Sequence, residues 1–246
     1  MALPTVAELL GPRRGREGTD EGAGDRRKNK RVRNTPHVEG DYSTHVFVDV
    51  QHDRGLCEAI EALASDLEKE LRERCGVVVQ SLGEGSKWHV SLSRTVALRK
   101  AQIETYTSLL RRQAKGLKEF ACGFGGVVVL RNDEGTTSFV ALALEDRGKG
   151  EGGGLDGLVN RVDWVHKRHG LREYYQREER LHHLSLLWAP GEDFARLTEG
   201  AKQLQAAAGT KAVRGLRDVQ RRRVLRVKAI SAKIGSQITT FSPSPT

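Results

Sequence analysis

The chain has 246 residues, a formal net charge of +9, 37% hydrophobic residues and three cysteines. This length fits one domain of ordinary size or two small lobes. No apolar run is close to the roughly 18–20 residues that cross a bilayer, so a membrane-spanning protein is not expected. Cys57, Cys75 and Cys122 show no Cys-x-x-Cys spacing, which argues against a disulfide framework or a thiolate zinc site and favours a reducing compartment.

Two segments concentrate positive charge. Residues 1–40 are rich in Gly, Arg, Asp and Glu without apolar periodicity, which predicts a disordered tail. Within this tail the run RRKNKRVR at 26–33 is typical of a nuclear-localisation signal, although such runs also occur as plain solvated charge. Residues 211–228 contain eight Lys or Arg and a single acid, Asp218. Charge of this kind suits a polyanion such as RNA, with a merely solvated surface as the alternative.

Helix and strand patterns alternate along the rest of the chain. A strand is predicted at 44–50 (THVFVDV), followed by a helix whose apolar residues recur every three or four positions from Leu56 until Gly76. Further helices are predicted at 99–118, 155–169 and 193–207. The other predicted strands are 77–82, 88–95, 120–131, 136–144, 181–188, 221–234 and 236–241.

Short connections between these strands indicate the class of fold. Hairpins are predicted around Asn132-Asp133-Glu134-Gly135 and across Gly235. The pattern indicates an α+β fold with antiparallel sheet, organised as a domain over 41–241 and a short tail at 242–246. The Gly-rich segment 146–154 does not follow the phosphate-loop pattern and is assigned no chemistry.

Two His-x-Ser triplets carry the candidate chemistry, one in WHVSLSRT and one in HHLSLLW. Successive side chains of a strand point to opposite faces. His89, Ser91 and Ser93 should therefore share one face, as should His183 and Ser185 in the second copy. A lone histidine in a strand is more often structural, but a matched pair with the same serine spacing favours catalysis.

This pair fits the cleavage of an RNA phosphodiester by its own 2′-hydroxyl. One imidazole takes the proton and the other protonates the leaving 5′-oxygen, and histidine does either near neutral pH. The serine hydroxyls donate to the non-bridging phosphate oxygens. The scheme needs no metal, and the sequence has no His-Glu-x-x-His, paired-Cys or Asp-x-Asp pattern. No metal and no cofactor are therefore expected, and the roles of base and acid stay open between the two histidines.

The two triplets resemble the motif pair that defines the 2H phosphoesterase superfamily. The strings THVFV, HVSLSRT, HLSLLWAPGED and AKIGSQITTF are most similar to the exoribonucleases that process the 3′ end of U6 small nuclear RNA, over roughly residues 44–241. The resemblance implies two pseudo-symmetric lobes of antiparallel sheet with helices around a central, positively charged cleft. It implies removal of 3′-terminal uridines or adenosines, leaving a 2′,3′-cyclic or 3′ phosphate, in the nucleus. It carries over His89, Ser91, His183 and Ser185 as catalytic.

Four further residues are predicted to contact the RNA. Ser93 follows the first motif on the same expected strand face. The resemblance implies an aromatic residue ahead of the second motif that stacks on a terminal base. The nearest candidate is Tyr175, two residues further upstream than the family spacing, with packing at a helix end as the alternative. Arg222 and Arg226 fall on one face of the predicted basic strand, where a solvated face is the alternative.

Other residues and other functions are given less weight. Trp188 is expected to pack behind the second motif, and His45 shows no partner pattern. The expected partner is RNA, with no membrane and no indicated protein partner, and the chain is expected to be a monomer. The rival functions are a cyclic phosphodiesterase or RNA 2′-5′ ligase of the same superfamily, and a non-catalytic RNA-binding module. The basic segments favour nuclear RNA, and two intact motifs argue against binding alone.

Overall fold

The computed structural model describes residues 40–82, 88–146, 153–176, 179–207 and 209–243. The basic run at 26–33, nearly all of the tail predicted at 1–40, and most of the segments 146–154 and 242–246 lie outside the described residues. Among the helices that are described, none is long and apolar enough to cross a bilayer.

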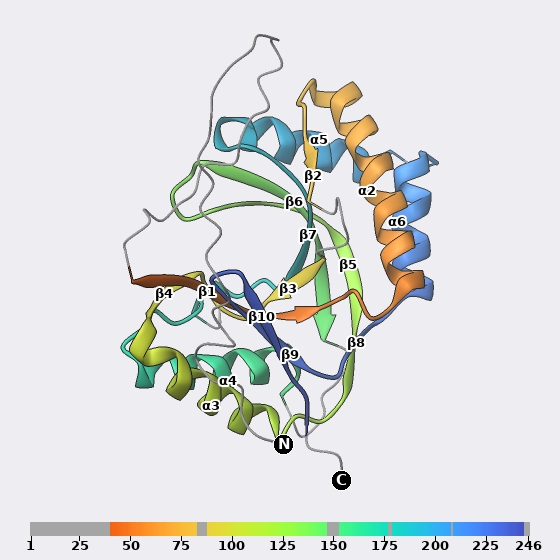
Figure 1. Cartoon of the computed structure of the whole chain (residues 1–246). Helices are drawn as coiled ribbons and strands as arrows, with labels where there is room; N and C mark the ends of the chain where they lie inside the picture. Colours follow the sequence, from red (N-terminus) through yellow and green to blue (C-terminus); the bar gives the residue numbers. More distant parts are fainter. Residues whose placement is uncertain (1–39, 83–87, 147–152, 177–178, 208, 244–246) are drawn as a thin grey trace, which may run out of the picture.

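Helices and strands alternate along the described chain (Figure 1). Short 3-10 turns precede α3 and α5. The elements are β1 (Asp41–Asp49), α2 (Arg54–Cys75), β2 (Gln80–Ser81), β3 (His89–Ser91), β4 (Val96–Arg99), α3 (Ile103–Ala114), β5 (Phe120–Arg131), β6 (Thr137–Asp146), α4 (Gly154–Arg168), β7 (His183–Pro190), α5 (Phe194–Ala206), α6 (Lys211–Arg222), β8 (Leu225–Val227), β9 (Ile230–Ile234) and β10 (Gln237–Phe241).

All these strands join a single sheet with the order β10-β9-β1-β3-β7-β6-β5-β8, to which β2 adds beside β7 and β4 beside β1. Every pairing in it is antiparallel. The two strands that carry the His-x-Ser motifs, β3 and β7, lie side by side at the centre, with three strands of the path beyond each of them. The predicted α+β class and the division into two halves are confirmed.

The helices cover the two halves separately. α2 packs on α5, α6 and β7, and α5 and α6 pack on β5, whereas α3 packs on α4 and on β10 at the other half (Figure 1). In the chain, α2 lies between β1 and β3, and α4 lies between β6 and β7. Helix α2 therefore follows a strand of the β1 half but packs on the β5 half, and α4 follows a strand of the β5 half but packs with α3 on the β1 half. This exchange interlocks the two halves.

Helix α2 forms where the apolar spacing predicts it. Its buried leucines and isoleucine recur every three or four residues. The carboxylate of Asp53 accepts a hydrogen bond from Leu56 N at 2.8 Å, which caps the first turn. The helix ends at Gly76, whose φ of 64° lies in the left-handed region that favours glycine.

Both predicted hairpins are present. Between β5 and β6, Thr137 N donates to Asn132 Oδ1 at 2.9 Å, so that the asparagine side chain closes the turn. Between β9 and β10 the chain reverses at Gly235, with φ 59°. These turns fix the register of the strands on either side of the central pair.

The basic segment 211–228 differs from its prediction. Residues 211–222 form helix α6 and not the start of a strand, and the strand expected at 221–234 is divided into β8 and β9. The hydroxyl of Thr210 accepts from Val213 N at 3.2 Å and caps α6. The buried residues of α6 have helical spacing, but arginines surround them and obscure the pattern in the sequence. They are Ala212, Val213, Leu216 and Val219.

Candidate active site

The central strands β3 and β7 bring the two His-x-Ser motifs together. Val90 pairs with Leu184 in antiparallel register, and continuing this register places His89 beside Ser185 and Ser91 beside His183. Directly opposed residues in such a pair are about 4.5–5.5 Å apart, and diagonal ones about 7–8 Å. The two imidazoles are diagonal neighbours and each has the other motif's serine beside it. The motifs therefore build one site.

Alternation along the two strands separates this site from the core. Val90, Leu184 and Leu186 are fully buried, whereas both histidines and both serines of the motifs are partly exposed. Neither Ser91 nor Ser185 has a side-chain hydrogen-bond partner among the described residues. Their hydroxyls are available to donate to a ligand on the exposed face.

A main-chain carbonyl orients the imidazole of His183. Its Nδ1 lies 2.7 Å from Leu181 O, and because a carbonyl only accepts, Nδ1 carries the hydrogen. Burial lowers the pKa of His183 below its ordinary value; the Leu181 bond acts in the opposite direction, and the neighbouring His182 and His89 lower the pKa further. With the hydrogen on Nδ1, Nε2 is the ring nitrogen that can accept a proton, and burial favours the neutral form of the ring.

His45 belongs to this site, although sequence reasoning gave it no partner. Its ring centroid lies 5.4 Å from that of His89 and 4.9 Å from that of Phe47, which in turn lies 5.3 Å from His89. The three rings form one wall of the site on β1 and β3. The only available signal was alternation along THVFVDV, which puts His45 and Phe47 on one strand face, but the sequence does not show which strand β1 joins.

A β-bulge in β7 also changes the expected face of Trp188. Val140 pairs with Leu187 whereas Ala141 pairs with Ser185, so β7 contains one extra residue. Beyond the bulge Trp188 pairs with Phe139, which lies on the same face of β6 as Ala141. Trp188 is therefore on the face of Ser185, not behind it, and the prediction that it packs behind the motif is wrong.

Ser93 does not share the face of His89 and Ser91. Strand β3 ends at Ser91, so alternation does not extend to Ser93. This serine is 3% exposed; its hydroxyl accepts from Val46 N at 2.8 Å and donates to Arg94 O at 2.9 Å. The hydroxyl ties the end of β3 to β1. The strand-face prediction for Ser93 is wrong because the strand is shorter than its sequence pattern.

Tyr175 lies in the segment between α4 and β7 and joins the end of β3 to the β5–β6 hairpin. Its hydroxyl donates to Asp133 Oδ1 at 2.9 Å, and Asp133 also pairs with Arg94. The Arg94 guanidinium lies 3.8 Å from the centroid of the Tyr175 ring, which is a cation–π contact. The ring is partly exposed. Its role in stacking on a base stays a prediction.

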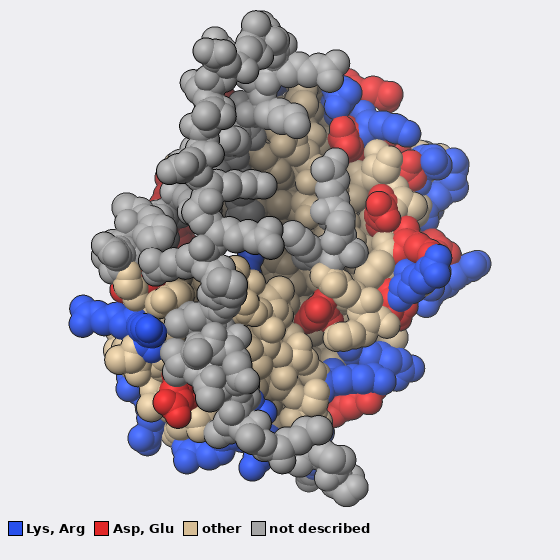
Figure 2. Space-filling view, in the orientation of Figure 1, with Lys and Arg blue, Asp and Glu red and all other residues tan. Residues whose placement is uncertain are grey.

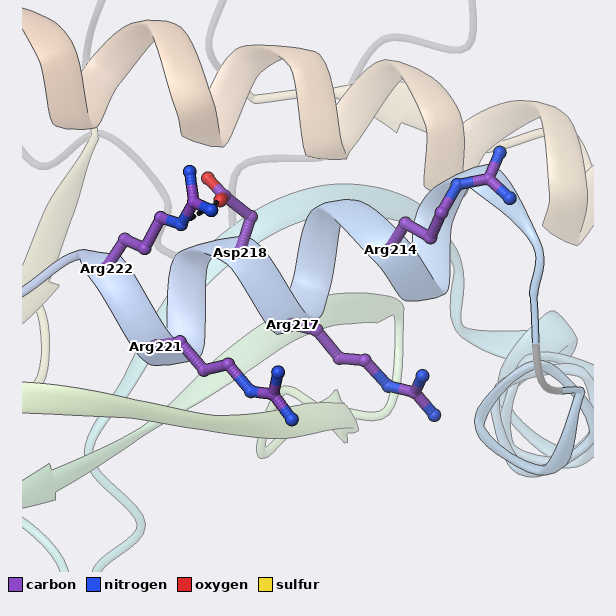
Figure 3. Close-up of a pocket in the computed structure, with 5 residues that line it drawn as sticks. All are labelled: Arg214, Arg217, Asp218, Arg221 and Arg222. Carbon is purple, nitrogen blue, oxygen red and sulfur yellow. Dashed lines mark ion pairs between the residues drawn. The ribbon is translucent and has the colours of Figure 1, made fainter.

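Arg222 and Arg226 are not neighbours on a strand. Arg222 is the last residue of α6 and pairs with Asp218 at 3.1 Å (Figure 3). Arg226 lies on β8 and approaches Glu119 at 3.8 Å. The prediction of one shared strand face is wrong because a helix occupies residues 211–222.

Among the described residues there is no group of three or more His, Cys, Asp or Glu side chains placed to hold a metal ion. His182, next to the second motif, points toward α4 and lies 3.1 Å from Asp156 Oδ1. This placement separates His182 from the two imidazoles of the site.

Comparisons with known proteins identify relatives of this chain. The model of the family described as "HVSL: Uncharacterised conserved protein" matches residues 14–242. U6 snRNA phosphodiesterase 1 of Drosophila melanogaster is 27% identical over 249 residues, 98% of this chain and 86% of that protein. The Homo sapiens protein of the same name is 30% identical over 190 residues, 76% of this chain and 66% of its own length. The structure of Kluyveromyces marxianus Usb1 with uridine monophosphate superposes with TM-score 0.58 at 17% identity, covering 81% of this chain and 98% of that one.

Proposed function

Because the chain belongs to the HVSL family, we propose that it is an RNA phosphodiesterase that removes terminal uridines or adenosines from the 3′ end of U6 small nuclear RNA. The relatives named U6 snRNA phosphodiesterase 1 extend over most of the chain and support this substrate. The two motifs predicted a resemblance to the enzymes that process the 3′ end of U6 RNA, and the same comparisons confirm that resemblance.

The observation that carries the proposal is the register of β3 and β7. Val90 opposite Leu184 places two imidazoles and two hydroxyls on one exposed patch about the size of a phosphodiester. Cleavage by an adjacent 2′-hydroxyl needs a base and an acid on opposite sides of the phosphorus, and donors for the non-bridging oxygens. Paired His-x-Ser motifs supply this set from two neighbouring strands.

The hydrogen bond at His183 Nδ1 supports His183 as the base and His89 as the acid. Its Nε2 takes the proton of the attacking 2′-hydroxyl, whose oxygen forms a bond to phosphorus. His89, entering the step protonated, gives its proton to the 5′-oxygen as the bond between that oxygen and phosphorus breaks. Ser91 and Ser185 donate to the non-bridging oxygens, where negative charge accumulates. The products are a shortened RNA ending in a 2′,3′-cyclic phosphate and a released nucleoside, and water opens the cyclic phosphate when the roles of the histidines reverse.

The same proposal covers location and partners. Processing of U6 RNA places the protein in the nucleus, in accord with the basic run at 26–33. RNA is the partner, the protein acts as a monomer, and neither a metal nor a cofactor takes part in the reaction.

The experiment is a trimming assay with purified protein and an RNA that ends in several uridines, in the presence of EDTA, with the new 3′ ends mapped. The expected result is stepwise shortening with cyclic or 3′-phosphate ends. His183→Ala should abolish shortening, whereas His52→Ala, which changes an exposed histidine outside the site, should not. Loss of trimming in EDTA, or cleavage within the RNA with no 3′ shortening, would contradict the proposal.

A further inference from the structure

Helix α6 presents a basic surface that is separate from the candidate active site. Its buried residues face α2 and β5. Its outer side lines a shallow groove formed by Arg214, Arg217, Asp218, Arg221 and Arg222. Blue side chains project from the right-hand edge of the molecule, where Figure 1 places α2 and α6 (Figure 2).

Half of the eight basic side chains of segment 211–228 are already paired with acids. Lys211 lies 3.0 Å from Asp66, Arg222 lies 3.1 Å from Asp218, and Arg226 and Lys228 both approach Glu119. These pairs leave four basic residues without an ion-pair partner among the described residues: Arg214, Arg217, Arg221 and Arg223.

Of these four, Arg217 and Arg221 lie side by side on the outer side of α6 (Figure 3). Both are exposed, and neither has an ion-pair partner among the described residues. They are one helical turn apart and extend side by side in the same direction, whereas Asp218 and Arg222 lie on the other side of the helix (Figure 3). Like charges at this spacing repel each other. An anionic partner that bridges the two guanidinium groups would relieve this repulsion.

We propose that Arg217 and Arg221 bind the phosphate backbone of the RNA upstream of the 3′ end that occupies the active site. This inference rests on the proposed function in taking RNA as the substrate. Guanidinium groups are suited to bidentate contact with phosphate. The surface also continues toward β8, the edge strand of the sheet, where Arg226 and Lys228 are exposed.

The position of α6 determines which RNAs reach it. Between β7 and β8 the sheet takes three strand steps, about 14 Å in all. The helix layer adds about 10 Å, because packed helices and sheets lie about that far apart. An RNA strand that leaves the active site past the β8 edge travels on the order of 25 Å before it meets Arg217 and Arg221. A dinucleotide does not span this distance, so these arginines should matter only for longer RNA.

The experiment compares Arg217→Gln/Arg221→Gln with the wild-type protein on two substrates. One is a uridine dinucleotide, for which kcat/KM is measured. The other is an RNA of about twenty nucleotides, longer than the roughly 4–16 nucleotides that common single-strand sites cover. This RNA has a 2′-deoxyribose at its penultimate nucleotide, so the attacking hydroxyl is missing and only binding is measured. The control is Lys100→Gln/Lys115→Gln. It removes the same charge from exposed positions that flank α3, on the other half of the molecule.

We expect the arginine variant to bind the long RNA roughly tenfold more weakly, with the slope of log affinity against log salt reduced by about 1.4, which is ~0.7 for each of two phosphates. Dinucleotide cleavage and the control should match the wild type, and Arg217→Lys/Arg221→Lys should retain most of the affinity and slope.

Unchanged binding in the Gln variant would overturn the proposal and leave the surface to an acidic protein partner. An equal loss of RNA affinity in the lysine control would also overturn the proposal, because it would show an effect of net charge alone. Binding is measured without cleavage, so a wild-type protein that binds but never trims RNA would contradict the proposed function alone.

Discussion

With His183 as the base and His89 as the acid, the rate should follow a bell-shaped dependence on pH. The base must be neutral, so the rate rises as pH increases through its pKa; the acid must be protonated, so the rate falls as pH increases through its own. Because burial lowers the pKa of His183, the acidic limb of the profile should have its midpoint below the ordinary histidine value of about 6.5.

The measurement is kcat/KM on a short RNA from about pH 4.5 to 9, a range that covers both limbs. His89→Ala should flatten the alkaline limb and keep the acidic one, whereas His183→Ala should flatten the acidic limb. An acidic limb that persists in His183→Ala would show that another group is the base.

The serines of the motifs should contribute less than the histidines. Ser91→Ala and Ser185→Ala are each expected to lower kcat about 10–100-fold, because water partly replaces a lost donor to the phosphate. Ser93→Ala is the matched control: its buried hydroxyl bonds the main chain, so kcat should stay unchanged while the free energy of unfolding falls by about 1 kcal/mol. A loss of kcat in Ser93→Ala equal to that in Ser91→Ala would contradict the assignment.

Sequence alone predicts that the four motif residues lie on exposed strand faces, because strand alternation and matched chemistry agree at these positions. It does not identify His45, because the contact with His89 depends on β1 pairing with β3, which no local pattern encodes. It misplaces Ser93 because the pattern WHVSLSRT continues beyond the end of the strand at Ser91. It misplaces Trp188 because a one-residue bulge reverses alternation without a sequence signal.

At the scale of elements, α6 joins the fold through a narrow apolar stripe. Leu216 is 6% exposed between α6 and its neighbours, so Leu216→Ala should lower the free energy of unfolding by about 2–4 kcal/mol. Arg217→Ala, the adjacent and exposed residue, should change it by less than about 0.5 kcal/mol. Chemical denaturation of both variants is the measurement. Equal small effects would mean that α6 is not packed on α2 as described.

The contrast between α2 and α6 shows what makes a helix predictable from its sequence. In α2 apolar residues recur at helical spacing from Leu56 to Leu71, between a capping aspartate and a terminal glycine, so the sequence pattern alone predicts the helix. In α6 four apolar residues stand among many arginines, and VLRV directly afterwards has strand character. Packing against α2 and β5 decides the structure there, and that packing is tertiary information.

At the scale of the whole molecule, the interlocked halves predict that the N-terminal tail is dispensable for chemistry. The described elements begin at β1, and the motifs are held by α2 and α4 crossing between the halves. Removing residues 1–39 should leave dinucleotide cleavage unchanged and reduce nuclear accumulation of a fluorescent fusion, because the basic run at 26–33 is lost. Replacing only those basic residues by Gln is the matched variant. Full nuclear retention without them would refute the localisation role of the run.

The proposed mechanism requires that the two imidazoles on adjacent strands act as one acid–base unit. Single-turnover rates of 3′ trimming in His89→Ala, His183→Ala and the double variant measure this coupling. Each single change should slow the reaction by about 10²–10⁴, and the double variant should be little slower than the worse single one, because both groups serve one displacement. If the rate losses of the two single variants multiply in the double variant, or if the single variants keep near-normal trimming, the two histidines do not act as one unit.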